Sequence, residues 1–288
     1  MLLALCIFGP APLLAQLPFY TDDPAVSQQG TLHFEFFNEL DALQSSQYPN
    51  LRQNTANFKV NYGLPYRLEL DIDAPYLSIS RAPAAAGASG PGDTNMGVKW
   101  EFRTLTAGSH SPAMAASLYI EFPTGNERQQ LGSGLTDYWL NFITQVPVTD
   151  KTRITGNAGF LFAGNTSTGV IGIQTARGHV FTGGVSLLHD FGARLTLGGE
   201  AYGGRADTGG LGRTQLQGLL GGMYELKNGL SVTFAVLGGK YEASPRVGGQ
   251  VGFALDFPAL FHRSSSNENS FAGSDSSQKP TFLPTLTP

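Results

Sequence analysis

The fold is decided by Tyr66-Arg67-Leu68-Glu69-Leu70-Asp71-Ile72-Asp73, in which apolar and ionised side chains alternate without a break. Successive side chains of an extended strand point to opposite faces, so this stretch predicts one apolar face and one charged face. The polar face of a soluble sheet usually mixes Thr, Ser and Lys. A wholly charged face opposite an apolar one is instead typical of a strand that separates lipid from a water-filled lumen.

The same alternation recurs along the chain. About twelve strands are predicted, each near the length needed to cross a bilayer at a tilt. They span 31–38, 53–62, 66–73, 94–103, 114–122, 135–146, 152–162, 179–189, 193–202, 213–225, 229–238 and 247–257. In 179–189 the alternation loses its phase around Gly183-Gly184, which predicts a β-bulge there.

The predicted connections are sorted by length. Every second one is long and rich in Gly, Ser, Asn and Ala, with 74–92 the longest, whereas those between them, such as 63–65 and 190–192, are short. Only 104–113 departs from this order. Transmembrane barrels place long loops outside the cell and short turns in the periplasm. The chain therefore predicts an all-β, transmembrane, antiparallel up-and-down β-barrel of about 12 strands in the bacterial outer membrane, with both termini periplasmic.

The composition supports this interpretation. Charged residues make up 14% of the chain, against about 25% in ordinary globular proteins. Glycine (37), Phe (19) and Tyr (10) are abundant instead, which favours many short strands over helical bundles. The net charge of −4 gives no electrostatic reason to expect nucleic acid as a partner.

The two ends of the chain lack the alternation. The apolar start is too short for a spanning helix and is broken by Pro10 and Pro12, as in a secretory signal; it also holds the single cysteine, Cys6. The segment that follows could plug the lumen or fold against it. The predicted organisation is a signal peptide (1–15), an N-terminal periplasmic lead-in (16–30), the outer-membrane barrel (31–257) and a disordered C-terminal tail (258–288).

The charged side chains on the inward face are predicted to line the lumen. They are Arg67, Glu69, Asp71, Asp73, Lys99, Glu101, Arg103, Glu121, Asp137, Arg153, Arg194 and Glu200. They form either a salt-bridged lumen wall or a constriction that selects solutes. Charge also predicts the pairing of 66–73 with 94–103: Asp73 opposite Asn95 brings Glu69 to Lys99, Arg67 to Glu101 and, outside, Leu70 to Val98. Sliding by one pair step would bring like charges together.

Three segments resemble a family of bacterial outer-membrane transporters labelled "meta-pathway of phenol degradation". They are Pro18-Phe-Tyr-Thr-Asp-Asp-Pro24 with Gly30, Gly92-Asp-Thr-Asn-Met-Gly-Val-Lys-Trp-Glu-Phe102, and Glu121-Phe-Pro-Thr-Gly125 with Leu131-Gly-Ser-Gly134. The likeness covers nearly all of 18–257 and implies an outer-membrane barrel associated with the passage of aromatic or other hydrophobic compounds. The last strand, Gln250-Val-Gly-Phe-Ala-Leu-Asp-Phe257, resembles an outer-membrane insertion signal. This implies the barrel assembly machinery as a partner, beside outer-membrane lipid and a small-molecule solute.

The sequence contains no Gly-x-Ser-x-Gly elbow, phosphate-binding loop or metal-spaced His cluster, so no enzyme activity, cofactor or metal is predicted. The predicted function is a channel for passive passage of small solutes, including hydrophobic or aromatic ones. Two alternatives stay open. One is a structural or surface-interaction barrel with a sealed lumen that binds partners through 40–52, 74–92 and 163–178. The other is an outer-membrane hydrolase that uses a His or Ser.

Overall fold

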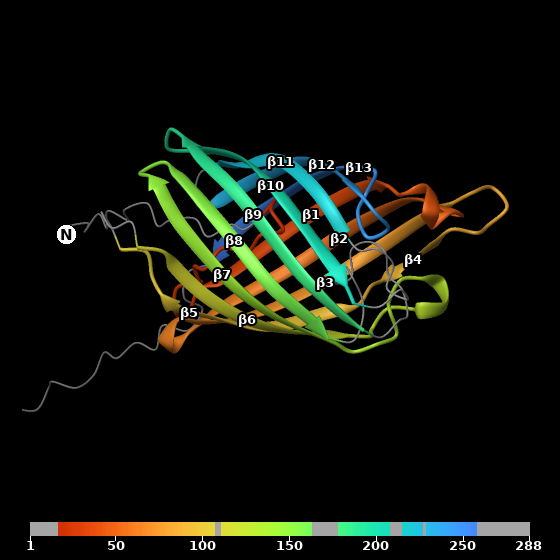
Figure 1. Ribbon diagram of the computed structural model, residues 1–288, viewed down its shortest axis with the longest axis horizontal. Coiled ribbons are helices and arrows are strands. Elements are labelled where there is room, and N and C mark those ends of the chain that lie inside the picture. The colour runs from red at the N-terminus through yellow and green to blue at the C-terminus, as the bar shows by residue number, and fades with distance from the viewer. Residues whose placement is uncertain (1–16, 107–110, 163–177, 208–214, 227–228, 258–288) are drawn as a thin grey trace, which may run out of the picture.

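The computed structural model describes residues 17–106, 111–162, 178–207, 215–226 and 229–257. These residues form a single antiparallel sheet that closes into a barrel (Figure 1). The predicted all-β barrel is thereby confirmed. The signal peptide predicted for 1–15 and the tail predicted for 258–288 lie outside the described residues.

Within the described residues the sheet has thirteen strands. They are β1 (Leu32–Ala42), β2 (Asn50–Leu64), β3 (Leu68–Arg81), β4 (Ala88–Pro91), β5 (Thr94–Arg103), β6 (Ala113–Phe122), β7 (Asp137–Thr149), β8 (Thr152–Phe162), β9 (His179–Phe191), β10 (Leu195–Ala206), β11 (Gln215–Glu225), β12 (Leu230–Lys240) and β13 (Val247–Phe257). Three short 3₁₀ turns accompany them: η1 (Ser45–Gln47), η2 (Pro65–Arg67) and η3 (Glu127–Gln129). The ring closes because β1 pairs with both β2 and β13, and β2 also pairs with β3. Twelve strands form the ring, and β4 extends the sheet beside β3.

Every predicted strand falls on an observed one, although several bounds differ; β1, for example, runs on to Ala42, where the prediction ended at 38. Three larger details were also wrong. The first is the long loop predicted at 74–92. There β3 runs on to Arg81 and β4 pairs with it, because alternation continues past Pro75: Leu77 and Ile79 are buried while Tyr76 is exposed. This hairpin extends beyond β5 at one end of the barrel.

The second correction concerns Tyr66 and Arg67, which were assigned to the decisive strand. Both have positive φ, 63° and 59°, and belong to the η2 turn between β2 and β3. The strand begins at Leu68. Pro65 fixes the start of this turn, and alternation of the next two side chains cannot distinguish a turn from a strand.

The third correction concerns the bulge predicted at Gly183-Gly184. In the described pairings of β9 with β8 and β10, the register runs unbroken through both glycines. Gly184 instead makes room for its neighbours, since a Cβ there would lie 2.6 Å from the Tyr202 ring and 2.8 Å from Thr21 Oγ1. The close neighbours of Gly184 explain why a small residue occupies this position, and the strand is not distorted there.

The predicted register between β3 and β5 is confirmed. Asp73 faces Asn95, Glu69 faces Lys99 and Leu70 faces Val98. The further pair of Arg67 with Glu101 is absent from the described β3–β5 ladder, which ends at Leu68 opposite Trp100. The observed register therefore places the opposite charges of Glu69 and Lys99 side by side, as the prediction from charge required.

The two faces of the barrel are the reverse of those of a soluble protein. Large apolar side chains point outward and are exposed, for example Leu140 (59%) and Phe142 (44%). Charged side chains point inward and are buried, for example Glu69 (2%) and Lys99 (4%). Such an arrangement is stable where lipid surrounds the barrel.

No helix among the described residues is long and apolar enough to cross a membrane.

The barrel has a loop end and a turn end. The hairpin of β3 and β4 marks the loop end, at the right of Figure 1, together with η1 and η3. The opposite turn end carries η2 and the tight connections 150–151 and 192–194. This sorting of connections is the one expected of a transmembrane barrel.

The apolar exterior gives a testable expectation. Replacing Phe142, near the middle of β7, by Arg should destabilise the folded barrel in lipid by about 2–4 kcal/mol, because the guanidinium would lie near the bilayer midplane. The matched control is Val148→Arg. Val148 is equally exposed (48%, against 44% for Phe142) but lies at the turn end, where the cost is about 0–1 kcal/mol. Urea unfolding in vesicles measures both. Equal losses would contradict a lipid-facing exterior.

Candidate functional site

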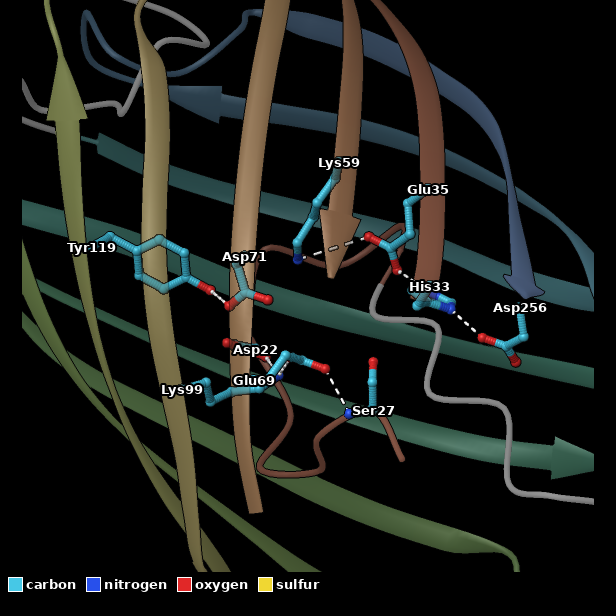
Figure 2. Close-up of polar contacts among 10 residues, drawn as sticks. All are labelled: Asp22, Ser27, His33, Glu35, Lys59, Glu69, Asp71, Lys99, Tyr119 and Asp256. Atoms are coloured by element: carbon cyan, nitrogen blue, oxygen red, sulfur yellow. Dashed lines mark hydrogen bonds and ion pairs between the residues drawn. The ribbon is translucent and has the colours of Figure 1, made fainter. Parts of the chain in front are cut away.

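The N-terminal segment 17–30, called the lead-in below, lies inside the barrel. Its hydrogen bonds to side chains of the wall reach strands on different sides of the ring, among them β1, β3, β5 and β10. Figure 2 shows its part from Asp22 to Ser27 next to the inner face of β3 and β5. The lead-in therefore crosses the lumen.

Two glutamates hold the first part of the lead-in. Glu200 of β10 accepts hydrogen bonds from the backbone N–H groups of Tyr20 (3.1 Å) and Thr21 (2.5 Å), one on each carboxylate oxygen. The Tyr20 hydroxyl lies 2.8 Å from both carboxylate oxygens of Glu39 on β1. Phe19 packs on Leu219 of β11 and on β12. A segment without regular structure needs such partners, because its buried backbone groups have no sheet neighbours.

Lys99 of β5 joins the lead-in to the wall. Its ammonium lies 3.2 Å from Asp22 Oδ1 in the lead-in and 3.1 Å from Glu69 Oε1 on β3. The other oxygen of Glu69 accepts from the backbone N–H of Ser27 at 2.6 Å (Figure 2). The charges are nearly inaccessible, with side chains 4% exposed at Lys99 and 2% at Glu69. This cluster fixes both ends of the 22–27 stretch.

Burial changes the acid–base properties of the lead-in. It raises the pKa of Asp22 to about 6, although Lys99 opposes the shift. It also raises the pKa of Tyr20, with a further contribution from the negative charge of Glu39. The Tyr20 hydroxyl therefore stays protonated and remains a hydrogen-bond donor at neutral pH.

A second polar network occupies the wall from β13 to β2. The two ring nitrogens of His33 lie 2.5 Å from Asp256 Oδ1 and 3.1 Å from Glu35 Oε1 (Figure 2). The other Glu35 oxygen lies 3.8 Å from the Lys59 ammonium. This chain of hydrogen-bonded and ion-paired groups resembles a salt-bridged wall. The described residues contain no group of three or more His, Cys, Asp or Glu side chains suited to a metal ion.

Aromatic side chains occupy the inner face of β6 and β7. The rings of Tyr119 and Trp139 are 6.0 Å apart, and the Tyr119 hydroxyl donates to Asp71 Oδ2 at 2.6 Å. Gly97 on β5 permits this, since a Cβ there would lie 2.2 Å from the Tyr119 ring. Both rings line a cavity of about 150 Å³ between the lead-in and the wall, which Lys59 also lines.

The sequence matches the family model described as "Putative MetA-pathway of phenol degradation" over residues 21–257. This match spans most of the chain, including most of the lead-in and all of the described barrel. The protein belongs to this family.

Solved structures share the fold of this family member at low sequence identity. The COG4313 outer membrane channel from Pseudomonas putida F1 is 13% identical, with a TM-score of 0.59 and coverage of 82% of this chain and 98% of that chain. The KdgM porin in complex with disordered oligogalacturonate is 11% identical, with a TM-score of 0.51 and coverage of 78% and 99%. No curated protein matches the sequence. At these identities the likeness establishes the fold.

The structure places the predicted lumen residues in three groups. Buried on the inner face are Glu69, Asp71, Lys99, Glu121, Asp137 and Glu200. Partly buried are Asp73, Glu101 and Arg153, the last with its guanidinium 2.9 Å from Asp190. Exposed are Arg67 in η2, Arg103 at the end of β5 and Arg194 in the turn before β10. The structure thus brings Glu69, Asp71 and Lys99 together and leaves the three arginines at the turn end.

Sequence reasoning placed Glu69, Lys99 and Glu200 in the lumen, but it missed Glu39 and did not show that any of them meets the lead-in. Glu39 lies past the predicted end of the first strand, and the partners of Tyr20 and Asp22 are distant in sequence. The inward position of Tyr119 was readable, because it alternates with the outward Leu118 and Ile120.

The raised pKa of Asp22 predicts a pH-dependent lead-in. Because the buried carboxyl binds its proton more tightly than a free one, whose pKa is 3.8, this group should favour docking increasingly as pH falls through about 6. Above that pH its ionisation opposes docking. The Asp22→Asn variant should lose this part of the pH dependence. Limited proteolysis of the lead-in between pH 4.5 and 7.5 measures it, with Asp23→Asn as control. An identical pH profile for wild type and Asp22→Asn would contradict this role.

Proposed function

We propose that the protein is an outer-membrane channel for the passive passage of small solutes, including hydrophobic or aromatic ones. The observation that carries this proposal is the closed barrel with an apolar exterior and a charged interior. A polar inner face is useful where water or solute enters the lumen. The solved relatives support it, since their names describe an outer membrane channel and a porin.

The family name supports aromatic solutes in particular. So does the inner pair of Tyr119 and Trp139, because flat rings offer a surface on which an aromatic solute can stack. In this proposal the loop end faces outside and the turn end faces the periplasm. The solute gradient alone drives passage, and no step requires catalysis.

The charged inner residues take part as the wall of the pathway. Glu69, Asp71 and Lys99 lie where the lead-in meets the barrel, so they determine how wide and how charged the passage is. Glu200 acts from the opposite side by holding Tyr20 and Thr21. These residues are the proposed constriction.

The experiment is solute-dependent swelling of liposomes that carry the purified protein. Small uncharged solutes should enter faster than larger ones, and empty liposomes give the baseline. The proposal would be overturned by a protein whose heat-modifiable migration on gels shows that the barrel is folded, but which admits no solute.

A barrel with a sealed lumen is the second candidate, favoured by the lead-in that crosses the lumen. It would act through its loop end, which carries η1, η3 and the β3–β4 hairpin. This candidate predicts no swelling and no conductance. It also predicts partner binding that is lost when the loop end is cut.

A further inference from the structure

The cavity between the lead-in and the wall has the size of one aromatic ring. Its volume is about 150 Å³, and apolar protein cavities of about that size bind benzene. Its apolar lining comes from Leu17 and Phe19 of the lead-in, Phe37 of β1, and Tyr119 and Trp139 of the barrel wall. A single ring can therefore contact aromatic side chains from the lead-in and from the wall at once.

Polar atoms without partners lie at the same cavity. Asp73 and Asn95 face each other across β3 and β5, and both line it. Within the described part of the chain, the Oδ1 atoms of both are buried and have no hydrogen-bond partner. A buried acceptor without a donor is costly, so a ligand that brings a donor gains affinity here.

The charges at the cavity select against anions. Its lining contains the carboxyl groups of Asp22, Glu35 and Asp73 and the single ammonium of Lys59. That ammonium already lies 3.8 Å from Glu35. An aromatic carboxylate would meet more negative than positive charge, whereas an uncharged hydroxyl would not.

We propose that this cavity binds one uncharged single-ring aromatic compound with a hydroxyl group on the ring, of which phenol is the simplest. The ring lies among Phe37, Tyr119 and Trp139, and the hydroxyl donates to Asn95 Oδ1, beside Asp73. The proposal rests on the proposed function, because the site lies in the pathway assigned to the solute. It adds a defined stopping place for the solute and a preference among aromatic compounds.

The two tryptophans provide the test. Trp139 lines the cavity, whereas Trp100 is 51% exposed on the outer face. The Trp100→Phe variant therefore reports on the cavity alone, and Trp139→Phe reports on the detergent or lipid side alone. Phenol, toluene and benzoate are titrated into each full-length variant while tryptophan is excited selectively.

Phenol should change the fluorescence of Trp100→Phe in a saturable way and leave Trp139→Phe with only a linear drift. Toluene should bind more weakly than phenol, and benzoate at least about tenfold more weakly, as expected for an unpaired charge. The Asn95→Leu variant should bind phenol about threefold to tenfold more weakly and bind toluene with unchanged affinity, because only phenol donates a hydrogen bond.

Benzoate binding as tightly as phenol, or the same linear response in both tryptophan variants, would overturn the proposal. The ligand order needs no variant at the site, so a misfolded Asn95→Leu does not remove the test. Liposome swelling is measured separately. Saturable phenol binding without swelling would support this site and contradict the channel function. Swelling without saturable binding would support the channel function and contradict this site.

Discussion

Deleting residues 17–28 is expected to raise the single-channel conductance of the protein severalfold. The lead-in crosses the lumen between Glu39 on β1, Glu200 on β10 and Lys99 on β5, so its removal widens the narrowest part of the passage. A barrel of about twelve strands leaves a lumen between the filled eight-stranded case and the open porins. Without an inner segment such a lumen should conduct.

The ladder that closes the ring does not depend on the deleted residues, because it consists of strand pairs from Leu32 to Phe257. The deleted protein should therefore still show heat-modifiable migration on gels. The control is a deletion of 83–86 between β3 and β4 at the loop end, which leaves the lead-in in place. Planar bilayer recordings compare the three proteins. Equal conductance for the wild type and the 17–28 deletion, both folded, would show that the lead-in does not limit passage.

Alternation made most of the barrel predictable from sequence. In β5, β8 and β13 the predicted bounds match the structure residue for residue, because each strand has lipid on one side and polar groups on the other. Charge added the β3–β5 register, since Glu69 and Lys99 must meet inside. These signals are local or involve neighbouring strands, so they can be read from the sequence.

The position of the lead-in could not be read in the same way. It has no period, and its partners come from strands far apart in the sequence: the contact between Thr21 and Glu200 spans 179 positions. Single residues such as Asp22 carry no sign of which wall they approach. The sequence suggested a plug or a segment lying against the barrel, and only the three-dimensional contacts identify Glu39, Lys99 and Glu200 as its anchors.

Replacing Lys99 by Met should destabilise the folded protein by about 3–5 kcal/mol, because removing one partner of a buried ion pair leaves the other charge unpaired. Met keeps most of the apolar stem, so the change isolates the ammonium. The Asp22 carboxylate can return to water if the lead-in leaves the lumen. Glu69 cannot, since it lies within the β3–β5 ladder opposite position 99. Weaker docking of the lead-in should therefore accompany the loss of stability.

Arg153→Met is the matched control for this prediction. Arg153 also pairs with a carboxylate, at 2.9 Å from Asp190, but the side chains are 29% and 34% exposed. Water screens such a pair, so its loss should cost about 0–1 kcal/mol. Urea unfolding in lipid vesicles measures both variants. Adding Asp22→Asn and Glu69→Gln to Lys99→Met should recover much of the stability, because no unpaired charge then remains in the cluster. If the triple variant were as unstable as Lys99→Met, the loss would come from packing at position 99, and the charge cluster would not be what holds the lead-in in the barrel.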